Sequence, residues 1–125
     1  MRILHIEDNV YKHHDIAKVI NGCGRICVDW VTYLNEGIKK LEESFKNNTP
    51  YDLIITDMYY PIEDNGKEVE AGELFISEAV KRGWNIPIIL CSSVSYVYPE
   101  IYATIHYSPN TDWEIELKKY IKKLI

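Results

Sequence analysis

The sequence predicts a single α/β domain, residues 1–125, in which helices cover both faces of a parallel sheet. Three observations support this fold class. The chain has 125 residues, a suitable length for one domain. Short apolar runs alternate strictly with amphipathic helical segments, which is typical of parallel strands joined by right-handed crossovers. The apolar runs are almost continuous, as expected for strands that are buried on both faces.

Five runs rich in β-branched residues are the predicted strands, and they span residues 2–6, 26–31, 52–56, 86–91 and 103–107. The spacing of apolar residues predicts helices over 10–21, 33–46 and 71–82, and a last helix that begins near Thr111. Gly22 is expected to end the first helix in a left-handed conformation. Thr111 and Glu114 fit a capping box at the start of the last helix.

Composition excludes several classes of function. The net charge of −5 argues against binding to nucleic acid phosphates or to an anionic membrane surface. No apolar run is long enough to cross a membrane, and the opening "MRILHIEDN" becomes acidic before a signal peptide could form, so we expect a cytoplasmic protein. The chain has three cysteines, an odd number, and their spacing is not that of zinc ligands. We therefore expect reduced, buried thiols at Cys23, Cys27 and Cys91.

Acidic and hydroxyl side chains follow three of the predicted strands. Glu7 and Asp8 follow the first strand, Asp57 follows the third, and Ser92 and Ser93 follow the fourth. Parallel strands bring their carboxyl ends to one edge of the sheet, where ligands bind in this class of fold. Three clustered carboxylates repel one another unless a cation lies among them, and their oxygens suit Mg²⁺. Asp57 can then act as a nucleophile toward phosphorus, with a nearby hydroxyl bonded to a phosphoryl oxygen.

Three segments, "RILHIEDN", "YDLIITDMYYP" and "IPIILCSS", resemble the receiver domains of two-component response regulators, and the resemblance covers nearly the whole chain. It implies a flavodoxin-like (CheY-like) three-layer sandwich with a five-stranded parallel sheet in the order 2-1-3-4-5. Matched residue by residue, Glu7 and Asp8 correspond to the acid pair that binds Mg²⁺ together with Asp57. Asp57 corresponds to the phosphoacceptor, and Ser92 to the switch hydroxyl.

The function that this resemblance implies is a stand-alone, receiver-like signalling protein of a two-component phosphorelay. It would accept a phosphoryl group on Asp57 and signal by protein–protein interaction. The implied partners are a histidine kinase or phosphotransfer protein, and a downstream protein that the sequence does not identify. The protein would not be an enzyme beyond self-catalysed phosphorylation and dephosphorylation of Asp57.

The chain departs from the receiver pattern at several positions. Ser108 stands before Pro109, where receivers carry a lysine that pairs with the phosphoryl group, and Ile105 stands where they carry an aromatic switch residue. The acidic loop 61–73 is longer than usual, whereas the segment from Ser92 to Ser108 is shorter, so the fourth helix should be short or missing. These departures favour an alternative function, that of a phosphorylation-independent pseudo-receiver acting as a protein-interaction module.

The missing lysine has two candidate replacements. Lys67, in the acidic loop after the third strand, is our preferred candidate, because a long flexible side chain there could reach the acids. Lys12 is expected to lie along the outer face of the first helix. His13 and His14 are expected to be a solvated pair on the same helix. The tyrosines of "SYVYPEIYATI" fit either a loop that covers the core or an aromatic contact patch.

Overall fold

A computed structural model, which describes residues 1–125, contains a five-stranded parallel sheet. Across the sheet the strands are β2 (Cys27–Val31), β1 (Arg2–Ile6), β3 (Leu53–Thr56), β6 (Ile88–Ser92) and β7 (Ala103–His106). All four neighbouring pairs of strands are parallel. Counted along the chain, these five strands have the order 2-1-3-4-5, so the predicted flavodoxin-like topology is confirmed.

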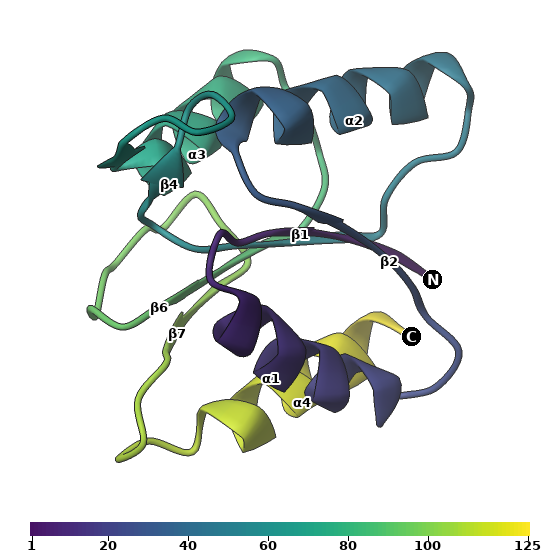
Figure 1. Ribbon diagram of the computed structural model, residues 1–125. Helices are drawn as coiled ribbons and strands as arrows, with labels where there is room; N and C mark the ends of the chain where they lie inside the picture. Colours follow the sequence, from purple (N-terminus) through teal and green to yellow (C-terminus); the bar gives the residue numbers. More distant parts are fainter.

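Two helices cover each face of the sheet (Figure 1). Helices α1 (Val10–Asn21) and α4 (Trp113–Leu124) lie on one face, and α2 (Leu34–Lys46) and α3 (Ala71–Lys81) lie on the other. Successive strand residues enter opposite layers, because Ile54 packs into the core beneath α2 and α3 whereas Ile55 packs into the core beneath α1 and α4. This two-sided burial explains the continuous apolar runs of the strands.

The connection between β6 and β7, residues 93–102, contains no helix. The expectation of a short or missing fourth helix is therefore confirmed, and the protein has four helices. None of the four is long and apolar enough to span a membrane.

The acidic loop after β3 forms a small antiparallel hairpin that the sequence analysis did not predict. Its strands are β4 (Tyr60–Pro61) and β5 (Glu68–Val69). Strand β4 lies beside α3 at the edge of the sheet where the parallel strands have their carboxyl ends, called the loop edge below (Figure 1). Tyr60 anchors the hairpin, since its ring is fully buried and its hydroxyl lies 2.9 Å from the hydroxyl of Thr56. The hairpin is thereby held close to the end of β3.

Two predicted helix ends differ in the structure. Gly22 has a right-handed backbone with φ of −73°, and the positive φ of this turn falls on Gly24 instead. The capping box does not form, because the Thr111 hydroxyl bonds to the carbonyls of His106 and Ser108 and α4 begins only at Trp113.

Two expectations about burial also need correction. The three cysteines are free, as expected, but Cys27 is exposed and Cys23 is half-buried, so only Cys91 fits the predicted burial. His13 is not solvated. Its ring stacks on Trp30 at a centroid distance of 4.0 Å, and its Nδ1 lies 2.8 Å from Nδ1 of the buried His5, because α1 packs this side of its first turn against β1 and β2.

Gly72 permits the close contact between α3 and the end of β3. Its N–H donates to the carbonyl of Met58 at 2.9 Å, and a Cβ at this position would collide with the carbonyl oxygen of Asp57. We predict that Gly72→Ala lowers the free energy of unfolding by ~1–3 kcal/mol, the usual cost of overpacking, measured by urea denaturation. Gly22→Ala is the matched control, because a Cβ there meets no atom closer than 3.4 Å. Equal stability of Gly72→Ala and the wild type would contradict this packing.

Candidate functional site

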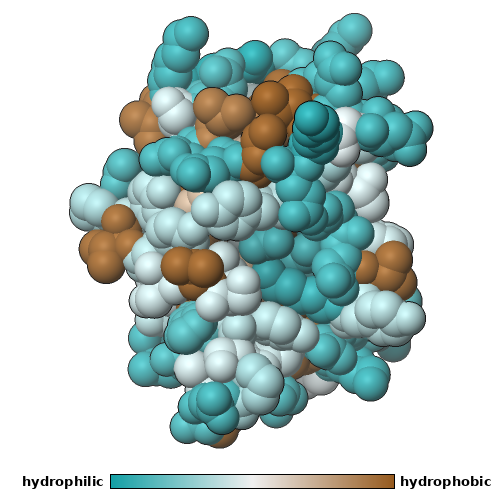
Figure 2. Space-filling view, turned by 60° about the vertical axis from the view of Figure 1, so that its left-hand side comes forward, coloured by the Kyte–Doolittle hydropathy of each residue, from teal (hydrophilic) through white to brown (hydrophobic).

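A cavity of about 500 Å³ opens at the carboxyl ends of the strands. It lies on the edge that Figure 2 turns toward the viewer, where the surface is mostly hydrophilic and the hydrophobic residues form separate groups. Ten residues line the cavity: Glu7, Asp8, Asn9, Tyr11, Lys12, Asp57, Tyr59, Glu68, Ser93 and Tyr107. A concave polar site therefore occupies the position that this fold class uses for ligands.

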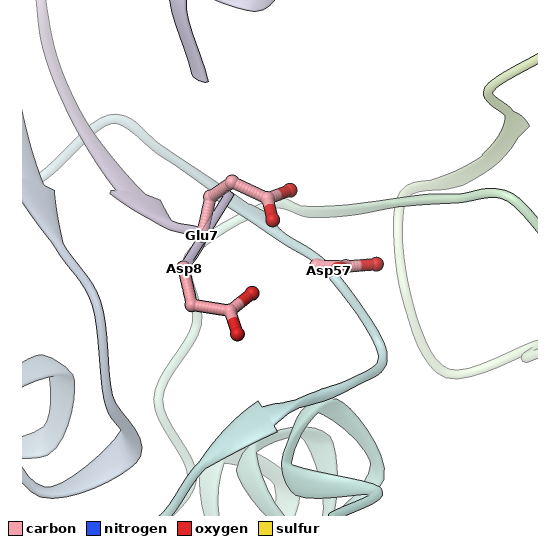
Figure 3. A group of neighbouring side chains, drawn as sticks. All are labelled: Glu7, Asp8 and Asp57. Carbon is pink, nitrogen blue, oxygen red and sulfur yellow. The ribbon is translucent and has the colours of Figure 1, made fainter. Parts of the chain in front are cut away.

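The three predicted acids meet in this cavity. One carboxylate oxygen from each of Glu7, Asp8 and Asp57 lies within 4.8 Å of the others, and all three side chains extend into the same space (Figure 3). Backbone hydrogen bonds position two of them, since the N–H of Asp57 donates to the carbonyl of Ile6 at 3.1 Å and the N–H of Glu7 donates to the carbonyl of Val31 at 3.0 Å. The parallel sheet itself thus sets the separation of the acids.

The environment of two of these acids disfavours negative charge. Glu7 is only 1% exposed, and its burial, together with the charge of Asp57, raises its pKa to about 8 against the opposing effect of Lys12. Burial and the neighbouring carboxylate of Glu68 raise the pKa of Asp8 to about 7. The site consequently has more acidic groups than its own cation can neutralise.

Lys12 supplies that cation, contrary to the expectation that it lies on the outer face of the helix. Its Nζ lies 3.0 Å from Oδ1 of Asp57 and 3.1 Å from Oε1 of Glu7, and it donates to the carbonyl of Cys91 at 2.7 Å. The residue is 8% exposed. Lys67, the preferred candidate, is exposed and does not line the cavity, so that preference was wrong.

The physical reason lies in the first turn of α1. The side chain of Asn9 accepts the N–H of Lys12 at 3.0 Å and caps the helix, which sets position 12 one turn from its start. Lys12 then shares the inward stripe of Ile16 and Ile20 at spacings of four residues. Helical side chains lean toward the helix N-terminus, which here is the loop edge of the sheet.

Lys12 keeps its charge despite its burial. Desolvation alone would lower the pKa of the amine, but the carboxylates of Glu7 and Asp57 outweigh it and raise this pKa above its ordinary value. The ring of Tyr107 lies 5.1 Å from the ammonium and adds a cation–π contact.

Ser92, the predicted switch hydroxyl, ends β6 beside the cavity. Its side chain is buried, and its Oγ accepts the N–H of Val94 at 3.3 Å. The neighbouring Ser93 lines the cavity, whereas Ser92 does not. Its switch role therefore stays a prediction.

The residues after β7 bring no cation to the acids. Ser108 lines a different cavity, together with Asp15 and Lys18. Ile105 is buried in the core beneath α1 and α4, so no aromatic side chain occupies that position. Tyr107 lies nearer to the site, with its hydroxyl donating to Asp15 at 2.8 Å.

Glu68 is a fourth acid at the site that the sequence analysis did not place. The β4–β5 hairpin brings it to the cavity, beside Asp8. The acidic composition of the loop 61–73 was a signal for it. Spacing alone did not indicate which of the loop acids reaches the site, because that depends on the unpredicted hairpin.

The tyrosines near the cavity are only partly involved in covering the core. Tyr98 packs against the core beneath α2 and α3, and the hydroxyl of Tyr102 donates to the carbonyl of Tyr120 at 3.3 Å. Tyr59 and Tyr96 lie at the loop edge with their hydroxyls 3.4 Å apart. The core-covering interpretation is confirmed for Tyr98, and the contact-patch interpretation stays a prediction.

Solved structures that resemble this chain include receiver domains and response regulators. The response regulator TrrA of Thermotoga maritima, solved with Mg²⁺ and beryllofluoride, is 25% identical, with a TM-score of 0.72 over 99% of this chain and 98% of that one. The fold is that of receiver domains. A chain in the complex of histidine kinase ThkA with TrrA matches at 25% identity and a TM-score of 0.73, covering 99% of this chain and 97% of that one.

A more distant receiver structure has the same architecture. The chemotaxis response regulator CheY4 of Vibrio cholerae is 14% identical, with a TM-score of 0.69 over 99% of this chain and 98% of that one. No family model and no curated protein sequence matches the chain. The receiver likeness is thus a likeness of structure.

Asp8 tests the electrostatics of the cavity, because it is not paired with Lys12 and adjoins both Glu68 and Asp57. We predict that Asp8→Asn raises the Tm of the metal-free protein by about 3 °C, since it removes a repulsion of roughly 1 kcal/mol. The same change should abolish the rise in Tm that Mg²⁺ produces in the wild type. Asp64→Asn, in the exposed part of the acidic loop, is the control. An unchanged response of Asp8→Asn to Mg²⁺ would exclude Asp8 as a ligand.

Proposed function

We propose that the protein is a receiver-like signalling protein of a two-component phosphorelay that accepts a phosphoryl group on Asp57. The observation that supports this most directly is the meeting of Asp57 with Glu7 and Asp8 at the loop edge of a receiver fold. The likeness to a response regulator solved with Mg²⁺ and beryllofluoride supports it further.

The residues of the site fit Mg²⁺. The donors are carboxylate oxygens from Glu7, Asp8 and Asp57, which are the hard ligands that this ion prefers. Oε1 of Glu7 is buried and accepts no hydrogen bond, although the ammonium of Lys12 lies 3.1 Å away. When bound, Mg²⁺ would neutralise charge on a phosphoryl oxygen.

Asp57 is arranged to act as the nucleophile. Its Oδ1 accepts the N–H of Met58 at 2.7 Å and faces the ammonium of Lys12, which leaves Oδ2 available to attack phosphorus. A bond forms between this oxygen and phosphorus, and the bond from phosphorus to the donor breaks with its electron pair leaving on the donor group. Ser92 would turn from the N–H of Val94 to bond a phosphoryl oxygen.

The phosphoryl donor would be a histidine kinase or phosphotransfer protein in the cytoplasm. A matched structure contains a response regulator bound to a histidine kinase, and the same kind of partner is proposed here. Output would pass to another protein rather than to nucleic acid or a membrane, in keeping with the net charge of −5. The chain's own chemistry would be limited to self-catalysed phosphorylation and dephosphorylation of Asp57.

A pseudo-receiver that acts without phosphorylation is the second candidate function. Two observations favour it: β7 is followed by Ser108 rather than a lysine, and the connection from β6 to β7 contains no helix. A protein-interaction module would need neither the lysine nor the helix.

Phosphorylation distinguishes the two functions. With acetyl phosphate and Mg²⁺, we expect the intact mass of the wild type to rise by one phosphoryl group, because Asp57 has a free oxygen beside a metal site and a cation. Asp57→Asn should not change in mass, whereas the exposed-loop control Asp64→Asn should behave as the wild type. A wild-type mass that stays constant under these conditions would favour the pseudo-receiver.

A further inference from the structure

We propose that Lys12, projecting from the first turn of α1, supplies the positive charge that stabilises a phosphoryl group on Asp57. This inference rests on the proposed function and deepens it, because it assigns to a helix residue the part that a strand-end lysine plays in the receiver pattern. That pattern has its lysine before Pro109, where this chain has Ser108.

The ammonium of Lys12 is fixed by three groups from different parts of the fold. These groups are Oδ1 of Asp57, just after β3, Oε1 of Glu7, just after β1, and the carbonyl of Cys91 in β6. Each lies 2.7 to 3.1 Å from Nζ of Lys12. One of these contacts, the carbonyl of Cys91, does not involve a proposed metal ligand, so the ammonium keeps that anchor when a metal ion binds Glu7 and Asp57.

The position of the charge relative to Asp57 supports a role in phosphoryl chemistry. The ammonium lies 3.0 Å from the carboxylate that would carry the phosphoryl group, on the side of Oδ1, while Oδ2 accepts no hydrogen bond from the protein. A phosphoryl group brings about two negative charges into a cavity that already holds four acidic side chains. A cation in contact with the acceptor offsets this charge, as phosphoryl-transfer sites require.

No other cation of the chain is placed to do this. Lys67 is exposed and outside the cavity, and Lys18, two turns further along α1, lines the cavity that holds Ser108. Lys12 is the one basic residue among the ten that line the acidic cavity.

A purely structural ion pair is the competing explanation. Burying a lysine between carboxylates is costly, and replacing such a pair by apolar groups is often neutral for stability. A structural pair would affect stability and metal binding together. If Lys12 instead serves as the cation for the phosphoryl group, its substitution should weaken the binding of a phosphoryl mimic and leave the binding of the metal alone unweakened.

The experiment compares Mg²⁺ alone with Mg²⁺ plus beryllofluoride, each titrated against the wild type and Lys12→Met. In Lys12→Met we expect the affinity for beryllofluoride to fall by about 10- to 100-fold, the factor expected for a lost charge-assisted hydrogen bond. The affinity for Mg²⁺ alone should stay the same or rise, because Lys12 no longer competes for Glu7. Lys18→Met is the matched control from the same helix and should bind both as the wild type does.

The outcomes separate this inference from the proposed function. Equal binding of beryllofluoride by Lys12→Met and the wild type overturns the role of Lys12 and leaves Asp57 as the acceptor. An equal loss of Mg²⁺ and beryllofluoride affinity also overturns it, in favour of a structural pair. Failure of the wild type to bind beryllofluoride overturns both proposals. If circular dichroism shows that Lys12→Met is unfolded, the same comparison with Lys12→Gln decides.

Discussion

The contact between the Lys12 ammonium and the carboxylates of Glu7 and Asp57 is the interaction on which the rest of the site depends. The parallel sheet forces three acids to one edge, and their mutual repulsion in a partly buried cavity would destabilise the fold without a cation. The ammonium of Lys12, a cation that the protein itself supplies, relieves part of this repulsion. It leaves Asp8 and one oxygen of Asp57 without a cation. In the proposed function a phosphoryl group would use that oxygen, and Mg²⁺ would bind Asp8 together with Glu7 and Asp57.

The carboxyl-end edge of the sheet combines the acidic cluster with features that differ from the receiver pattern described above. The connection from β6 to β7 has no helix, and the loop after β3 has become a hairpin that adds Glu68 to the cavity. The cation comes from α1 rather than from the end of β7. These features surround Asp57, while the strand order is that of the receiver fold and Glu7, Asp8 and Asp57 lie together at the carboxyl ends of the strands.

The sheet, its order and the meeting of the acids were predictable, because they depend on local patterns and on the geometry of parallel strands. Lys12 was predicted wrongly although a signal existed: it falls four residues before Ile16 on the inward stripe, and Asn9 is a good helix cap. A lysine is ordinarily expected to face solvent, but here the carboxylates of Glu7 and Asp57 stabilise its charge in the interior. Glu68 and His13 depended on tertiary contacts, with the hairpin in one case and with Trp30 in the other, that no local pattern encodes.

A crystal structure of the protein with Mg²⁺ and beryllofluoride would test the central claim most directly. The account predicts beryllofluoride on a carboxylate oxygen of Asp57, Mg²⁺ held by Glu7, Asp8 and Asp57, and the ammonium of Lys12 within hydrogen-bonding distance of a fluorine. A complex in which beryllofluoride binds Asp57 while Lys12 points away from it, with another basic side chain or none in its place, would contradict the account.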